Sequence, residues 1–264
     1  MELYENINYT SEISYLTNTF IYELDIQKAN INVLYSKKVI SKDIYDFLKN
    51  SERMVRQVYV GKLQKNPDVV NVLKQGIIEA KKILFEANQI QDYEVLSIKN
   101  DAVFIIGRLP QIRQFGLINF IPKNVYTGFY KVLNYEFYYY YNKLNKEEVL
   151  HVKGIGKSIE KHIGYFYDFL KDLFYTIQCD GIEIALRLLK DYYIQYITLQ
   201  LPIGHYRRFN PISDYHFKII TDAGNGFSMD NASDDQKPLL DISNNLKILL
   251  ELNKILNNIY FNKY

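Results

Sequence analysis

The chain has 264 residues, a formal net charge of +2, 48% hydrophobic and 23% charged residues, and one cysteine. This composition is too apolar for a disordered chain and excludes an internal disulfide, and the length suffices to bury a core. A charge so near zero does not by itself indicate nucleic-acid binding. No stretch reaches the roughly 18–20 apolar residues of a membrane span, and the acidic start does not resemble a signal peptide. We therefore expect a cytoplasmic protein that does not contact a membrane.

The first part of the chain alternates between strand and helix patterns. Thr19–Ile26 is rich in β-forming residues and predicts a strand, after which residues 27–35 switch to helical spacing. Ser41 is a suitable N-cap for a second helix. This helix is predicted over residues 42–48, and two further helices are predicted over residues 51–64 and 68–87, separated by Pro67.

A hairpin is predicted next. Tyr93–Ile98 and Ala102–Gly107 are β-rich runs separated by Lys99, Asn100 and Asp101, and Asn and Asp tolerate the left-handed backbone of a tight turn. Further strands are expected over 117–121 and 134–141, and a helical region with helices over 159–173, 181–199 and 239–260 and a polar loop over 222–238. At least two of the four consecutive tyrosines at 138–141 should be buried, because a strand presents alternate side chains to opposite faces.

These elements predict an α+β fold in which an antiparallel sheet is packed by helices and is followed by a mostly helical C-terminal region. The boundary between the two regions is expected near residue 155, giving regions 1–155 and 156–264.

Two aspartates within this pattern are candidate metal ligands. Asp25 lies near the end of the first strand, and Asp101 lies at the tip of the hairpin. If these strands are neighbours, both carboxylates lie at one edge of the sheet, where they could hold two Mg²⁺ or Mn²⁺ ions roughly 3.5–4 Å apart. Glu23, on the same strand face as Asp25, could be a third ligand, although an exposed strand glutamate is the more common case. Either aspartate taken alone is more often a cap or turn residue than a functional one.

The order of these elements resembles the palm of nucleic-acid polymerases of the A and B families. YELDIQKANINVL is similar to the first palm motif, and SIKNDAVFI is similar to the later hairpin motif. SERMVRQVYVGK supplies Arg53, Arg56 and Lys62 on a helix, where those families place basic residues against the triphosphate. YEFYYYYNKLNKEEVLHVKGI resembles the strand–turn–KGI segment that touches the primer–template backbone in B-family enzymes.

The resemblance covers about the first 155 residues and implies a palm-like sheet with a short, helical, fingers-like insertion at about 41–90. It implies a metal-dependent nucleotidyltransferase, specifically a small phage-like DNA polymerase, with Asp25 and Asp101 as catalytic metal ligands. Its partners would be a primer–template, nucleoside triphosphates and additional replication subunits. A phage-encoded chain would act in the cytoplasm of its bacterial host.

A second, weaker resemblance overlaps the KGI segment. NKEEVLHVKGIGKSIEKHI is similar to a helix-hairpin-helix motif, in which Gly154 and Gly156 would let the backbone approach a DNA phosphate and Lys153 and Lys157 would lie nearby. Residues 144–152 cannot be both strand–turn and helix, so the two resemblances are alternatives. A simple turn at a helix N-terminus is a third.

Other functions remain open. Arg207 and Arg208 could contact backbone phosphates, although paired arginines are more often solvated or salt-bridged. With the GIGK turn, they would suit a non-catalytic DNA-binding or replication-accessory protein. A structural or interaction protein, whose last helix docks on a partner, is the third possibility.

Overall fold

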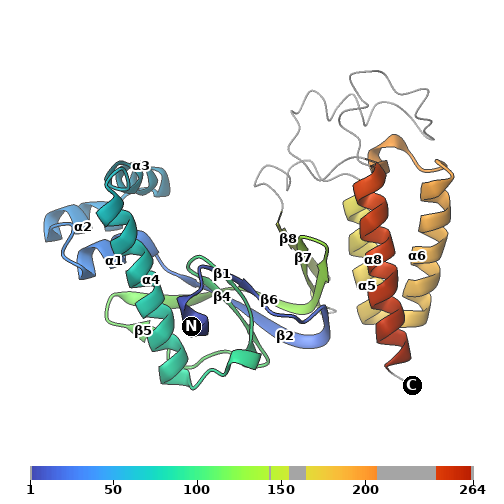
Figure 1. Ribbon diagram of the computed structural model, residues 1–264, viewed down its shortest axis with the longest axis horizontal. Coiled ribbons are helices and arrows are strands. Elements are labelled where there is room, and N and C mark those ends of the chain that lie inside the picture. The colour runs from blue at the N-terminus through green and yellow to red at the C-terminus, as the bar shows by residue number, and fades with distance from the viewer. Residues whose placement is uncertain (1, 143, 155–164, 207–241, 263–264) are drawn as a thin grey trace. The chain divides into compact units, whose positions relative to one another are not determined.

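The computed structural model describes residues 2–142, 144–154, 165–206 and 242–262. Within these ranges an eight-stranded sheet has the strand order β1-β3-β4-β2-β6-β7-β8, and β5 pairs with β6 (Figure 1). Strands β1, β3, β4 and β2 pair antiparallel, as do β6, β7 and β8. With its helices, the chain therefore has the α+β fold that the sequence predicts.

The strands are β1 (Asn8–Thr10), β2 (Tyr15–Ile26), β3 (Val95–Lys99), β4 (Ala102–Ile106), β5 (Gln114–Phe115), β6 (Ile118–Val132), β7 (Tyr135–Asn142) and β8 (Glu147–Lys153). The α-helices are α1 (Ala29–Ser36), α2 (Lys42–Asn50), α3 (Arg53–Leu63), α4 (Pro67–Asn88), α5 (Tyr165–Cys179), α6 (Ile182–Ile197) and α8 (Ile242–Phe261). Short 3₁₀ turns are η1 (Leu3–Glu5), η2 (Asp92–Glu94) and η4 (Ile203–Tyr206).

The local signals in the sequence account for several element ends. The Ser41 hydroxyl accepts a hydrogen bond from the backbone N–H of Ile44 and caps α2, and Pro67 opens α4. Asn100 closes the β3–β4 hairpin at a φ of 57°. The strand expected over 117–121 is longer than predicted: β6 continues to Val132 because its second half pairs with β7.

The chain forms two compact units. The first comprises residues 1–12 and 19–125, and the second comprises residues 13–18 and 126–264. Strands β2 and β6 contribute to both. In the first unit, helices α1, α2 and α3 gather near the start of the long helix α4 (Figure 1).

Close packing of α1 against α4 fixes the helical part of the first unit. A Cβ atom on Gly76 of α4 would lie 2.3 Å from Cγ1 of Val33, which is buried in α1. Only glycine allows these two helices to approach so closely without displacing the valine.

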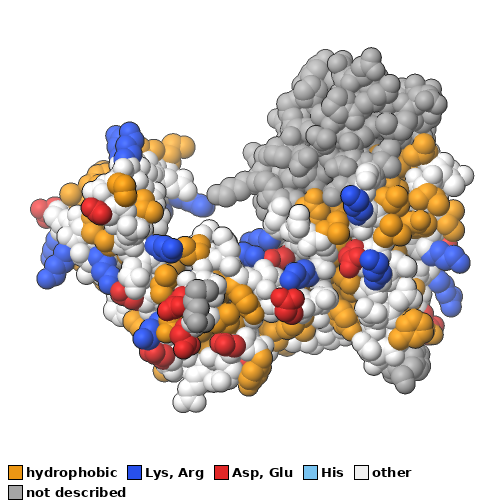
Figure 2. All heavy atoms as spheres, in the orientation of Figure 1, with side chains coloured by type: hydrophobic (Ala, Val, Ile, Leu, Met, Phe, Trp, Pro, Cys, Tyr) orange, Lys and Arg blue, Asp and Glu red, His pale blue; other side chains and the backbone are white. Residues whose placement is uncertain are grey.

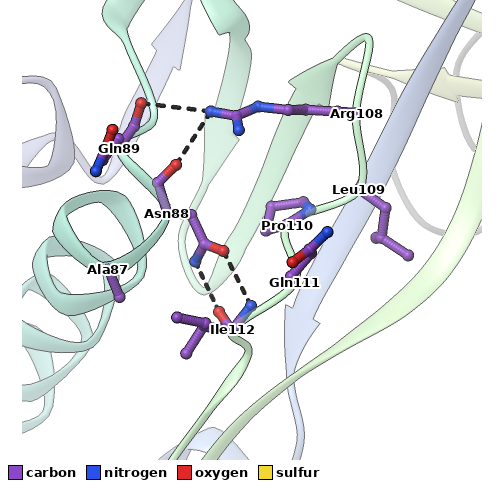
Figure 3. A pocket seen from close by; sticks show the side chains of 8 residues that line it. All are labelled: Ala87, Asn88, Gln89, Arg108, Leu109, Pro110, Gln111 and Ile112. Carbon is purple, nitrogen blue, oxygen red and sulfur yellow. Dashed lines mark hydrogen bonds between the residues drawn. The ribbon is translucent and has the colours of Figure 1, made fainter.

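The other end of α4 is tied to the loop after β4 (Figure 3). The Asn88 side chain donates to the carbonyl of Ile112 at 2.7 Å and accepts from its N–H at 2.9 Å. The Arg108 guanidinium donates to the carbonyls of Asn88 and Gln89 and pairs with Glu94 at 3.0 Å. A cation at the carbonyl end of a helix also complements the helix dipole.

An aromatic core holds the second unit together. The Tyr130 ring stacks on Phe174 of α5 with centroids 4.4 Å apart, and Phe169 stacks on Tyr192 of α6. Tyr138 and Tyr139 are fully buried, which confirms that at least two of the four consecutive tyrosines belong to a core.

The helix-hairpin-helix prediction is wrong for its first helix. Residues 147–153 form β8, which pairs with β7 along its whole length, because Val149, Leu150 and Val152 favour a strand packed beside the tyrosines of β7. Gly154 has a φ of +90°, and a Cβ there would lie 2.2 Å from the carbonyl oxygen of Asn134. A glycine is therefore needed at this position because two backbone segments approach closely.

Every helix in the described ranges is too short or too polar to cross a membrane.

Candidate active site

The register of the sheet brings Asp25 and Asp101 together. Asp25 of β2 lies opposite Ala102 of β4, and Asp101 directly precedes Ala102 in the hairpin turn. The two carboxyl groups lie close enough for the negative charge of Asp25 to act on Asp101. The two aspartates therefore meet at one edge of the sheet, as the sequence predicts.

The pair is electrostatically strained. Burial raises the pKa of Asp101, and the negative charge of Asp25 raises that pKa further, while the nearby Lys123 ammonium opposes the shift. Two carboxylates this close repel each other when both are ionised. They are therefore suited to hold a proton or a cation between them.

A cavity of about 580 Å³ adjoins the pair, within the size range of small-molecule sites. Asp25 and Asp101 line it together with Arg53 and Arg56 of α3. Lys28, Asn30, Gln57, Gln64 and Lys123 add further polar groups. Acidic and basic side chains therefore line the same cavity.

The cations of this cavity differ in how they are engaged. The Lys28 ammonium donates to the carbonyl of Lys49 at 2.6 Å, and the Arg56 guanidinium donates to the carbonyl of Ser51. Within the described residues, the Arg53 side chain makes neither a hydrogen bond nor an ion pair. Such a guanidinium is suited to bind a phosphate group of a ligand.

Comparison with protein families places the chain. A family model described as Bacteriophage PBS1 gene 130 protein matches residues 1–258. The chain belongs to this family. No curated protein matches the chain. The description of the PBS1 gene 130 family names a phage gene and no activity.

The structure brings four of the predicted site residues together in this family member: Asp25, Asp101, Arg53 and Arg56 line one cavity. Lys62, the third predicted cation of α3, is exposed and is not among the residues that line it. The helix spacing explains the difference, because Lys62 does not share the face on which Arg53, Arg56 and Gln57 lie.

Glu23 is buried, whereas a glutamate on a strand is more commonly exposed. Its side chain is 1% exposed and its carboxylate accepts a hydrogen bond from the Asn124 amide at 2.6 Å. It does not line the cavity, and its role as a third ligand stays a prediction.

Two of the predicted nucleic-acid contacts fall within the described residues. Lys153 and Gly154 belong to the second unit, at the end of β8. Gly156, Lys157, Arg207 and Arg208 lie outside the described residues.

The sequence reading missed Lys123. Its ammonium lies 3.7 Å from the Asp25 carboxylate, and it reaches the cavity from β6. No local motif marks this lysine, because its place depends on β6 lying beside β2 in the strand order.

A second cavity, of about 340 Å³, shares Asn30, Gln64 and Asp101 with the first. Deeper in this unit, Lys81 of α4 is fully buried and donates to the carbonyl of Asn6. Burial lowers the pKa of Lys81 to about 8, although the negative charge of Asp101 acts in the opposite direction.

The donor set fits a hard divalent cation. Both side chains at the sheet edge are carboxylates, and oxygen atoms are the ligands that Mg²⁺ and Mn²⁺ take. Across the described part of the chain, no three His, Cys, Asp or Glu side chains are grouped to hold a metal. A pair of carboxylates matches a Mg²⁺ site that substrate phosphates and water complete.

On the face that Figure 2 shows, side chains of one charge do not form a continuous patch. Lysine and arginine side chains are spread over it, with acidic and apolar groups between them. This distribution agrees with the net charge of +2.

Proposed function

We propose that this chain is a metal-dependent nucleotidyltransferase, specifically a small phage-type DNA polymerase that extends the 3′ end of a nucleic acid. The observation that carries the proposal is the cavity that the neighbouring carboxyl groups of Asp25 and Asp101 line together with Arg53 and Arg56.

The chemistry of the cavity matches the needs of nucleotidyl transfer. Asp25 and Asp101 would hold Mg²⁺ or Mn²⁺, which activates the attacking 3′-hydroxyl and stabilises the leaving pyrophosphate when bound. Arg53 and Arg56 would neutralise the phosphates of the incoming nucleoside triphosphate. The aspartates lie on β2 and in the β3–β4 hairpin, and the arginines lie on α3. The metal ions and the triphosphate would therefore bind at different places in the cavity.

The arrangement of elements supports the polymerase part of the proposal. β2 carries Asp25 and leads into α1, and the hairpin β3–β4 with Asp101 lies beside β2 in the sheet. This order agrees with the resemblance to the palm of A- and B-family polymerases. Membership of a bacteriophage family agrees with a phage-type enzyme.

Primer extension tests the proposal. Purified protein is supplied with a labelled primer–template, nucleoside triphosphates and Mg²⁺ or Mn²⁺, beside the variants Asp25→Asn and Asp101→Asn. Each variant should reduce extension by at least about 100-fold, because each removes a ligand charge where the chemistry occurs. The matched control, Asp43→Asn, neutralises an exposed aspartate of α2 and should extend normally.

Two results would contradict the proposal. Extension that persists in both active-site variants would show that the pair is not catalytic. A wild-type protein that binds duplex but extends nothing with either metal would favour the replication-accessory alternative.

A further inference from the structure

We propose that Lys123 is a phosphate-binding residue of the cavity, held at Asp25 until a divalent cation neutralises that carboxylate. This inference rests on the proposed function, because it assigns Lys123 a role toward the same triphosphate. It concerns a residue that no motif in the sequence marks.

The backbone around Lys123 is anchored on both sides. The Asn119 carbonyl accepts a hydrogen bond from the N–H of Gln27 at 2.9 Å, just past the end of β2. The Asn124 amide donates to the buried Glu23 carboxylate at 2.6 Å. The start of the Lys123 side chain is therefore fixed beside β2, while its long chain can move the ammonium within the cavity.

The contact between Lys123 and Asp25 is weak enough to be replaced by a contact between Lys123 and a phosphate group. The Lys123 ammonium lies 3.7 Å from the carboxylate oxygen, and the two side chains are 54% and 29% exposed. An ion pair this long and this exposed contributes little to stability. Its loss can therefore be offset by a new contact of similar strength.

The charges around the cavity define that new contact. The described lining contains four basic side chains and two acidic ones, so it stays positive even with both aspartates ionised. Lys28 and Arg56 are engaged with backbone carbonyls, which leaves Arg53 and Lys123 as the cations best able to bind an anion. A cation on Asp25 would repel the Lys123 ammonium, and a triphosphate in the cavity would attract it.

This exchange predicts two opposite effects of one substitution. Lys123→Gln removes a charge that competes with a divalent cation for Asp25, so Mn²⁺ alone should bind about fivefold more tightly. The same change removes a phosphate contact, so a nucleoside triphosphate should bind about three- to tenfold more weakly in the presence of Mn²⁺. A purely structural role for Lys123 would not move the two affinities in opposite directions.

The experiment measures both affinities by titration calorimetry on the full chain. The probes are Mn²⁺ alone and a non-hydrolysable deoxynucleoside triphosphate with saturating Mn²⁺, at about pH 8.5 so that carboxyl groups are ionised. Lys65→Gln is the matched control: it removes one charge from an exposed lysine outside the cavity lining and should leave both affinities unchanged. Circular dichroism checks that both variants fold.

The outcomes separate this inference from the proposed function. Tighter Mn²⁺ and weaker triphosphate binding in Lys123→Gln alone supports the role of Lys123. If wild type binds both probes and Lys123→Gln binds either with unchanged affinity, the role of Lys123 is overturned and the proposed function stands. A wild-type protein that binds neither probe overturns both.

Discussion

The carboxyl group of Asp25 lies close to that of Asp101, although Asp25 belongs to β2 and Asp101 lies in the turn of the β3–β4 hairpin. The contact exists because Asp25 lies opposite Ala102, the first residue of β4, and Asp101 immediately precedes it. A cost is built into this arrangement, since the second negative charge must be brought next to the first in a partly buried place.

The raised pKa of Asp101 predicts how stability depends on pH without divalent cations. Between the ordinary carboxyl pKa and the raised one, the folded protein binds more protons than the unfolded chain, so the contribution of Asp101 to stability falls as pH rises. Asp101→Asn removes this contribution. The wild-type melting temperature should therefore decline relative to that of Asp101→Asn as pH rises through this range.

Thermal melts from about pH 4 to pH 8 with a chelator check this expectation. Asp43→Asn, at an exposed position of α2, should follow the wild-type curve. Added Mn²⁺ should recover wild-type stability at the upper end of the range and leave Asp101→Asn nearly unchanged. Wild-type and Asp101→Asn curves that run parallel would refute the coupling of the pair.

Gly76→Ala should destabilise the protein by about 1–3 kcal/mol, because the new Cβ would overlap Val33 Cγ1. Gly61→Ala is the matched control: it lies in α3, a Cβ there meets nothing within 4 Å, and it should stabilise by about 0.5–1 kcal/mol. Urea unfolding of both variants measures the difference. Because Val33 is buried, Val33→Ala is measured alone as well. The double variant should lose less than the two single variants together, and additive losses would show that the overlap is not the cause.

Local signals in the sequence predict the strand–helix passage at Asp25 and the hairpin at Asp101, because a turn residue and a change of periodicity are visible within a few residues. They do not predict Lys123, which reaches Asp25 only through the neighbourhood of β6 and β2. The ambiguity at residues 144–152 has the same origin. Charged residues there allow a helix, and only pairing with the buried tyrosines of β7 decides for β8.

Asn88→Ala should cost about 1–3 kcal/mol of stability. The Asn88 amide satisfies both the N–H and the carbonyl of Ile112, and alanine would leave both groups without this support (Figure 3). Asn50→Ala is a suitable comparison, since the Asn50 amide makes one exposed bond to the carbonyl of Asp46 and its loss should cost well under 1 kcal/mol. Denaturant unfolding separates the two, and equal losses would contradict the bridging role of Asn88.

His205 should make the second unit sensitive to acid. Burial lowers the pKa of His205 to about 4, and its Nδ1 lies 2.9 Å from the hydroxyl of Tyr192. Between this pKa and the ordinary value of 6.5, the unfolded chain binds more protons than the folded protein, so stability falls as pH drops through this window. After allowance for solvent screening of a partly exposed ring, the loss should be about 1–2 kcal/mol.

His205→Gln cannot take up this proton, so its free energy of unfolding, measured in urea at several pH values, should vary less than that of wild type between pH 6.5 and pH 4. Curves of equal slope would assign the acid sensitivity to other groups.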